Sequence, residues 1–144
     1  MDKTVPLPVL RLFVLGLVFW VIAMLIFRLF GQVLLVPGDT FRTVLLFAAV
    51  FPLMYVLMNA VLSAQRLAGK DRVVGATWLL APGLLLDGLV SVPFFGLVFP
   101  NMAVSAASLF GALMCAGYAT GFLVSLLPSW KRLQQAAPRT TRLS

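Results

Sequence analysis

The chain has 144 residues, of which 62% are hydrophobic and 10% charged, and its net charge is +7. Ordinary soluble domains are about 45–50% apolar and about 25% charged, so this chain has too few polar residues to cover a soluble surface. Its apolar residues form blocks long enough to cross a bilayer, which takes about 20 helical residues. We therefore expect one membrane domain over residues 1–144.

Four apolar blocks predict an all-α fold, a polytopic four-transmembrane-helix bundle. The expected helices and the polar tail cover residues 12–36, 43–62, 73–92, 102–127 and 128–144. The first block exceeds the apolar region of a signal peptide, so we interpret it as a retained helix. Pro37-Gly38 ends this block, and Asp39 or Thr40 is expected to cap the second helix.

The second half of the chain contains residues that predict a helix bend, a helix cap and interfacial segments. Pro82-Gly83 predicts a bend in the third helix. The aromatic segment Phe94 to Phe99 is expected at the membrane interface, where aromatic rings are favoured. Asn101 is expected to cap the fourth helix. Trp130-Lys131-Arg132 predicts an interfacial anchor before the polar tail.

Basic residues are distributed unevenly between the two sides of a four-crossing bundle. One side collects nine of them: Lys3, Arg11, Arg66, Lys70, Arg72, Lys131, Arg132, Arg139 and Arg142. The other side has only Arg28 and Arg42. The positive-inside rule then predicts cytoplasmic N- and C-termini, in the bacterial inner membrane or an equivalent internal membrane. Nucleic acid is not expected as a partner, because the cations form no basic helical face or motif.

Asp87 interrupts an apolar stretch of the third helix. A charged Asp at the bilayer centre costs about 2.5–3.5 kcal/mol, so it is expected to face protein, water or a partner. Arg28 lies at a similar distance along the first helix, and we hypothesise an Arg28–Asp87 ion pair. That pair has two interpretations, a structural clip or a proton or cation site. Alternatively, Arg28 extends its long stem to the outer interface.

Other polar and small residues predict contacts between helices. Tyr55 and Asn59 share one face of the second helix, as interhelical hydrogen-bond partners or as ligand contacts. Small residues at four-residue spacing allow close backbone approach in the fourth helix: Ala107, Gly111, Gly117 and Gly121. These pairs do not all share one face, so this helix is expected to pack against more than one neighbour.

The composition also limits the chemistry. The chain has no His and one Cys, which excludes His-ligated haem or copper and a Cys-x-x-Cys redox pair. It has no glycine-rich phosphate-binding loop with its Lys, and only four acidic residues. We therefore expect no enzymatic activity, no metal and no cofactor.

Short motifs add a family resemblance. They are Phe27-Arg28-Leu29-Phe30-Gly31-Gln32, Leu86-Asp87-Gly88, Phe99-Pro100-Asn101 and Leu109-Phe110-Gly111-Ala112. Together they resemble a family of small four-helix bacterial membrane proteins of unknown function, over roughly residues 12–127. The resemblance implies four helices and no activity. It also implies a shared polar cluster near the outer face, formed by Arg28, Gln32, Asp87 and Asn101.

Three functional hypotheses follow. The first is a non-enzymatic accessory or stabilising subunit of a larger membrane complex, whose partners are the lipid bilayer and other membrane proteins or a second copy. The second is a small oligomeric transporter or channel component that uses Asp87 and Arg28. The third is a lipid- or pigment-contacting protein that uses Phe94 to Phe99.

Overall fold

The computed structural model describes residues 8–127, and four of its helices are long and apolar enough to cross a membrane. The elements are α1 (Val9–Leu34), α2 (Thr40–Ala64), α3 (Lys70–Leu86), the π-helical turn η1 (Asp87–Ser91), α4 (Phe95–Val98), the 3-10 turn η2 (Val104–Ala106) and α5 (Ala107–Leu126). Within the described residues the fold is all-α, which confirms the predicted class. The polar tail and the anchor at 130–132 lie outside these residues.

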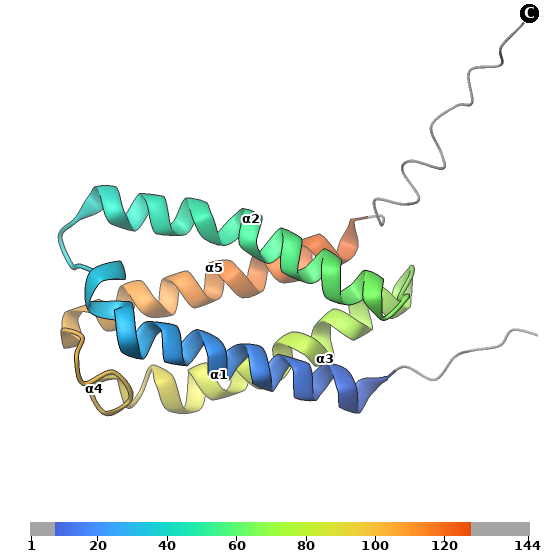
Figure 1. Cartoon of the computed structure of the whole chain (residues 1–144), viewed down its shortest axis with the longest axis horizontal. Helices are drawn as coiled ribbons and strands as arrows, with labels where there is room; N and C mark the ends of the chain where they lie inside the picture. The colour runs from blue at the N-terminus through green and yellow to red at the C-terminus, as the bar shows by residue number, and fades with distance from the viewer. Residues whose placement is uncertain (1–7, 128–144) are drawn as a thin grey trace, which may run out of the picture.

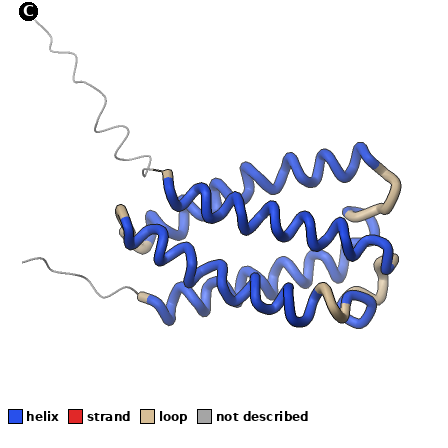
Figure 2. The backbone as a smooth tube through the Cα atoms, turned by 180° about the vertical axis from the view of Figure 1, so that it is seen from behind, coloured by secondary structure: helices blue, strands red, loops and turns tan. Residues whose placement is uncertain are grey.

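The four long helices alternate in direction along the chain, so both ends of the described chain lie at the same end of the bundle (Figure 1). Helix α1 packs along α3, and α5 packs against both α2 and α3, whereas α1 and α2 share few contacts. The connections between helices are confined to the two ends of the bundle (Figure 2). This arrangement satisfies backbone hydrogen bonds within each helix, as a bilayer requires.

Helix α2 begins at a side-chain cap. Asp39 Oδ1 accepts a hydrogen bond of 3.0 Å from the backbone N–H of Arg42, and Asp39 Oδ2 lies 3.0 Å from Arg42 Nε. The expected Asp39 cap is therefore confirmed. The expected Asn101 cap is wrong, because α5 begins at Ala107 after a 3-10 turn and the Asn101 side chain binds elsewhere.

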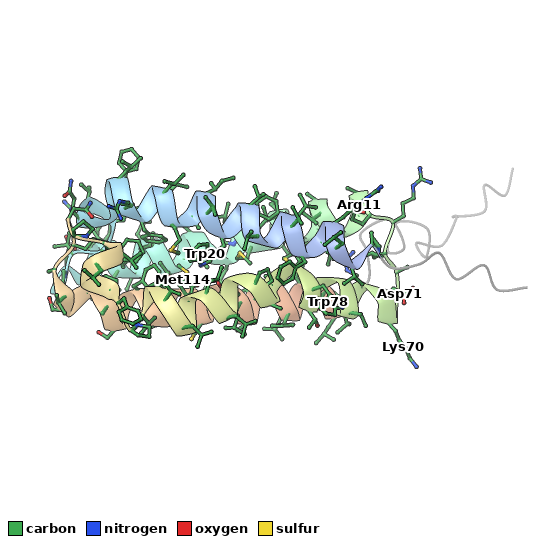
Figure 3. All side chains as sticks on the ribbon, turned by 90° about the horizontal axis from the view of Figure 1, so that it is seen from below. Arg11, Trp20, Lys70, Asp71, Trp78 and Met114 are labelled. Carbon is green, nitrogen blue, oxygen red and sulfur yellow. The ribbon has the colours of Figure 1, made fainter. Side chains whose placement is uncertain are left out.

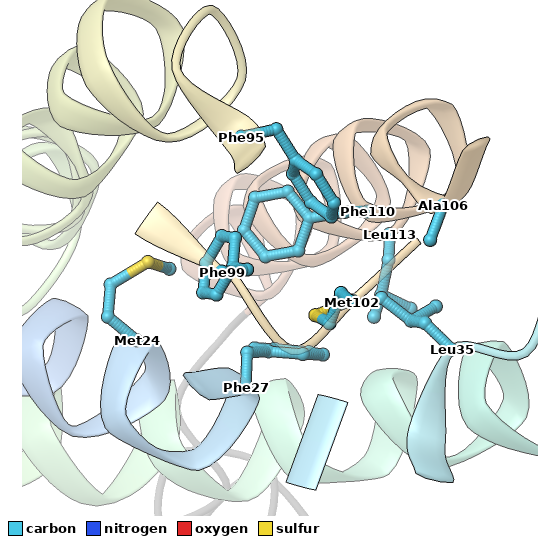
Figure 4. Close-up of a cluster of buried hydrophobic side chains, with 9 residues drawn as sticks. All are labelled: Met24, Phe27, Leu35, Phe95, Phe99, Met102, Ala106, Phe110 and Leu113. Carbon is cyan, nitrogen blue, oxygen red and sulfur yellow. The ribbon is translucent and has the colours of Figure 1, made fainter. Parts of the chain in front are cut away.

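A buried cluster fills the end of the bundle where α4 lies (Figure 4). Its nine members are Met24, Phe27, Leu35, Phe95, Phe99, Met102, Ala106, Phe110 and Leu113. Phe110 is central, since its ring centroid lies 5.3 Å from that of Phe27 and 5.0 Å from that of Phe99. Such edge-on and tilted aromatic pairs add stability beyond the area that they bury.

This cluster corrects the interpretation of the aromatic segment. Phe95 and Phe99 are 3% and 0% exposed, so they are core residues rather than interfacial ones. Phe94 remains exposed. The reason is the short helix α4, which turns two of the rings inward. A second buried cluster, at the opposite end, is aliphatic: Met58, Leu62, Ala76, Leu79, Leu80 and Val124.

Candidate functional site

The contact between α1 and α3 positions the principal polar group of the bundle. Leu12, Gly16, Trp20 and Met24 follow one another at four-residue spacing and form one stripe of α1. A Cβ atom added at Gly16 would lie only 1.9 Å from the carbonyl oxygen of Leu79, so the two backbones meet closely at this point. One turn further along α1, this close approach brings the indole of Trp20 to α3.

Asp87 is the polar group that this contact positions. It is 4% exposed, although it lies in a membrane-spanning helix. Its Oδ1 accepts a hydrogen bond of 2.8 Å from Trp20 Nε1, and its Oδ2 accepts one of 2.5 Å from the Tyr118 hydroxyl. Each carboxyl oxygen thus has a donor, from α1 on one side and from α5 on the other. We call Asp87, Trp20 and Tyr118 the three-helix node.

Helix geometry changes at the node. Asp87 opens the π-helical turn, in which its carbonyl accepts a 3.0 Å hydrogen bond from the N–H of Val92, five residues on. One turn earlier in α3, Gly83 leaves room for Tyr118. The Tyr118 hydroxyl would lie only 2.7 Å from a Cβ atom added at Gly83. Single π-helical turns inside α-helices are frequent at functional sites. The node can therefore hold three helices together or present one titratable group inside the membrane.

The expected Arg28–Asp87 ion pair is absent among the described residues, whose salt bridge is Asp39–Arg42. Instead, Arg28 Nη1 donates a hydrogen bond of 2.8 Å to the carbonyl of Val98. The physical reason is register: Trp20 stands opposite Asp87, and Arg28 lies eight residues beyond Trp20, about 12 Å along an α-helix. Counted from the ends of their own helices, Arg28 and Asp87 reach similar depths, but that count omits the register of α1 against α3.

The expected polar cluster is consequently divided. Asn101 Nδ2 donates a hydrogen bond of 2.6 Å to the carbonyl of Arg28, so these two residues fasten the segment after α4 to the end of α1. Asp87 belongs to the three-helix node instead. Gln32 is exposed, and its side chain makes no hydrogen bond within residues 8–127.

Tyr55 and Asn59 have different environments although they share a helix face. Asn59 Nδ2 donates to the Tyr55 carbonyl within α2, while Asn59 Oδ1 accepts a hydrogen bond from Arg72 Nη2 on α3. Asn59 therefore makes an interhelical hydrogen bond. The Tyr55 side chain is 40% exposed and its hydroxyl makes no hydrogen bond among the described residues.

The small residues of α5 face two neighbours. A Cβ on Gly121 would lie 2.9 Å from Leu80 of α3 and 3.3 Å from Met54 of α2. Gly117 lies beside α2, with Val50 at 3.6 Å from such an atom. Gly111 has only an ordinary contact at 3.9 Å, and Ala107 borders the aromatic cluster. Of the four expected packing residues, Gly121 alone lies at a tight contact, whereas the contacts of Gly117 and Gly111 are ordinary.

Sequence reasoning missed four residues that matter here: Gly16, Trp20, Arg72 and Tyr118. The four-residue spacing of Gly16 and Trp20 with Leu12 and Met24 was a readable signal for one stripe of α1. Nothing in the sequence indicated that Tyr118 would meet Asp87. Arg72 was counted among the cations of a connector, whereas the structure buries it in α3.

Comparison with known proteins supplies the family. The sequence profile of a family of unknown function, DUF5367, matches residues 34–132, which are 99 of the 144 residues. The match includes Asp87 and Tyr118 but not Trp20, and it leaves out the motif at 27–32. No curated protein and no solved structure matches the chain. With more than half of its length matched, the chain belongs to the DUF5367 family of unknown function.

Proposed function

We propose that the protein is a non-enzymatic integral membrane protein that serves as an accessory or stabilising subunit of a larger membrane complex. The observation that supports this proposal is the three-helix node. Both oxygens of the Asp87 carboxyl group are occupied by donors from α1 and α5, which is the arrangement of a structural clip. Intramembrane polar groups that bond to one another fix the register of helices.

The outer surface supports the same proposal. Helix α2 is the least buried of the four spans, with 6% of its most apolar window buried inside the bundle. Its exposed side chains include large apolar ones: Phe41, Val44, Leu45, Phe51, Leu53 and Val56. In a bilayer, such a face contacts lipid or the helices of a partner. We place the partner's helices on this face.

The proposed orientation follows from charge. The described end of the bundle that holds Arg11, Arg66 and Lys70 is the cytoplasmic end in this proposal, because short cytoplasmic loops are rich in Lys and Arg. Both termini are then cytoplasmic, and the membrane is the bacterial inner membrane or an equivalent internal one. A cysteine-accessibility experiment at Gln65 and at Gly38, one at each end of the bundle, tests this orientation with impermeant reagents.

Photo-crosslinking in the native membrane tests the subunit proposal. A crosslinkable residue is placed singly at four exposed positions, one per long helix: Leu25, Phe51, Leu85 and Leu123. We expect Phe51 to capture one partner reproducibly, while the other three positions serve as matched controls. The absence of any protein crosslink from all four positions, together with the mass of a monomer after gentle extraction, would contradict the proposal.

A second candidate function is a small oligomeric transporter or channel component. The π-helical turn at Asp87 favours it, because such turns are frequent at functional sites. Arg28 binds the carbonyl of Val98, so this candidate depends on Asp87 alone. It predicts pH- or ion-dependent flux in vesicles that Asp87→Asn abolishes. Vesicles that show equal flux with and without the wild-type protein would exclude this candidate.

A further inference from the structure

Arg72 is a buried charge whose hydrogen bonds are incomplete. It lies in the first turn of α3 and is only 2% exposed. Its Nη2 donates to Asn59 Oδ1, which is a neutral acceptor. Its Nε and Nη1 are buried and have no hydrogen-bond partner within residues 8–127. No acid of the described chain forms a salt bridge with it.

This arrangement is physically costly. A guanidinium group keeps its charge under all ordinary conditions, so it cannot relieve burial by losing a proton. A buried charge without an opposite charge is strongly destabilising, and a buried N–H without an acceptor adds the cost of its own desolvation. The missing component at Arg72 is therefore an anion that carries several hydrogen-bond acceptors.

The surroundings of Arg72 indicate which anion fits. Arg11, Arg66 and Lys70 are exposed at the same end of the bundle, and Figure 3 shows Arg11 and Lys70 there. Asp71, also labelled, is the acidic residue of this end among the described residues, and it too is exposed. Arg72 is two residues from the start of a membrane-spanning helix. This position corresponds to the level of the lipid headgroups.

We propose that Arg72 binds the phosphate group of an anionic phospholipid at this end of the bundle. The phosphate oxygens accept from Nε and Nη1, while Asn59 holds Nη2 and orients the guanidinium. The exposed cations draw anionic lipid to this end, since each Lys or Arg near a charged membrane surface contributes about 1 kcal/mol of attraction.

The connection at 65–69 adjoins the site, since the backbone N–H of Arg72 donates a hydrogen bond of 3.2 Å to the carbonyl of Gly69. Leu67 folds back onto α3, where its Cδ1 lies 2.3 Å from the place that a Cβ on Gly75 would take. Gly75 is one turn from Arg72, on the same side of the helix. Since Nε and Nη1 are covered, the phosphate enters from the end of the bundle as the side chains of this connection move aside.

Thermal unfolding of the full-length protein tests the proposal. The protein is purified in a zwitterionic detergent, and phosphatidylglycerol, phosphatidylcholine or inorganic phosphate is added. We expect phosphatidylglycerol to raise the Tm and phosphatidylcholine to have little effect. In Arg72→Gln, the lipid should bind at least about tenfold more weakly, because hydrogen bonds to a charged group are lost. Arg42→Gln, an exposed arginine at the opposite end, is the matched control and should retain the full shift.

Each result decides between alternatives. An equal Tm shift in Arg72→Gln and in the wild-type protein would overturn the proposal. A shift produced by inorganic phosphate alone would overturn the lipid assignment in favour of free phosphate. If Arg72→Gln does not fold, native mass spectrometry of the wild-type protein decides: adducts that favour phosphatidylglycerol over phosphatidylcholine support the site, and equal adducts of both lipids overturn it.

Discussion

Two buried ionisable side chains lie in this bundle, and their environments are opposite. Asp87 has a donor on each carboxyl oxygen, one from Trp20 of α1 and one from Tyr118 of α5. Arg72 has one neutral acceptor, Asn59, and its remaining nitrogen atoms have none within the described chain. The first side chain has a donor on each oxygen within the described residues, whereas the charge of the second requires a group from outside them.

The difference teaches how burial of a charge is to be interpreted in a membrane protein. A polar group whose hydrogen bonds are satisfied internally stabilises helix packing, and it need not meet a ligand. A buried charge with unfilled hydrogen bonds destabilises the fold until something binds it. Asp87 is 4% exposed and Arg72 is 2% exposed, so the two side chains are similarly buried. They differ in the number of hydrogen-bond partners.

The largest expected effect breaks the complete site. Asp87→Ala leaves the N–H of Trp20 and the hydroxyl of Tyr118 without their acceptor, and each buried donor left without a partner costs about 1–3 kcal/mol. We expect the free energy of unfolding in mixed detergent micelles to fall by at least about 2 kcal/mol. Asp71→Asn, on an exposed side chain, is the control. Equal stability of Asp87→Ala and wild type would show that the node does not hold the helices.

The next effect concerns the backbone contact that supports the same site. Gly16→Ala puts a Cβ 1.9 Å from the Leu79 carbonyl oxygen, and overpacking of this kind costs about 1–3 kcal/mol. The helices must then separate at Trp20, so we expect the tryptophan fluorescence of the protein to change together with stability. Gly111→Ala, whose nearest neighbour is at 3.9 Å, should be neutral. A destabilised Gly111→Ala beside a stable Gly16→Ala would reverse our assignment of the tight contact.

A smaller effect isolates one hydrogen bond of the node. Tyr118→Phe removes the donor to Asp87 Oδ2 and should lower the free energy of unfolding by about 0.5–1.5 kcal/mol. Tyr55→Phe removes a hydroxyl that has no hydrogen bond among the described residues, so it should leave stability unchanged. A double-mutant cycle with Asp87→Ala measures the coupling. No coupling energy between positions 118 and 87 would contradict the hydrogen bond.

The smallest effect is expected at the incomplete site in the absence of anionic lipid. Replacing both partners by apolar residues, as in Arg72→Met with Asn59→Leu, removes the buried charge and its acceptor together. Such paired replacements are nearly neutral or stabilising. We expect the double variant to unfold in zwitterionic detergent at a temperature equal to or above that of the wild type. A large loss of stability there would show that Arg72, like Asp87, is satisfied within the protein.

Much of the architecture could be predicted from hydrophobic block length. The four spans and the Asp39 cap follow from local features, because a helix in a bilayer is determined by the apolar length and the breaking residues of its own segment. The candidate site was harder to predict. Asp87 was identified by its position in an apolar stretch. Its hydrogen-bond partners, Trp20 and Tyr118, lie 67 and 31 residues away from it in the sequence.

The sequence by itself determined that this is a membrane protein of four helices with an acid inside one apolar span and an uneven distribution of cations. Only the tertiary structure decided the register of α1 against α3, which pairs Trp20 with Asp87 and leaves Arg28 to the carbonyl of Val98. It also decided that Phe95 and Phe99 turn inward and that Arg72 is buried. The physical reason is that register depends on close contacts such as that of Gly16 with Leu79. Such contacts join residues far apart in the chain, and no local pattern specifies them.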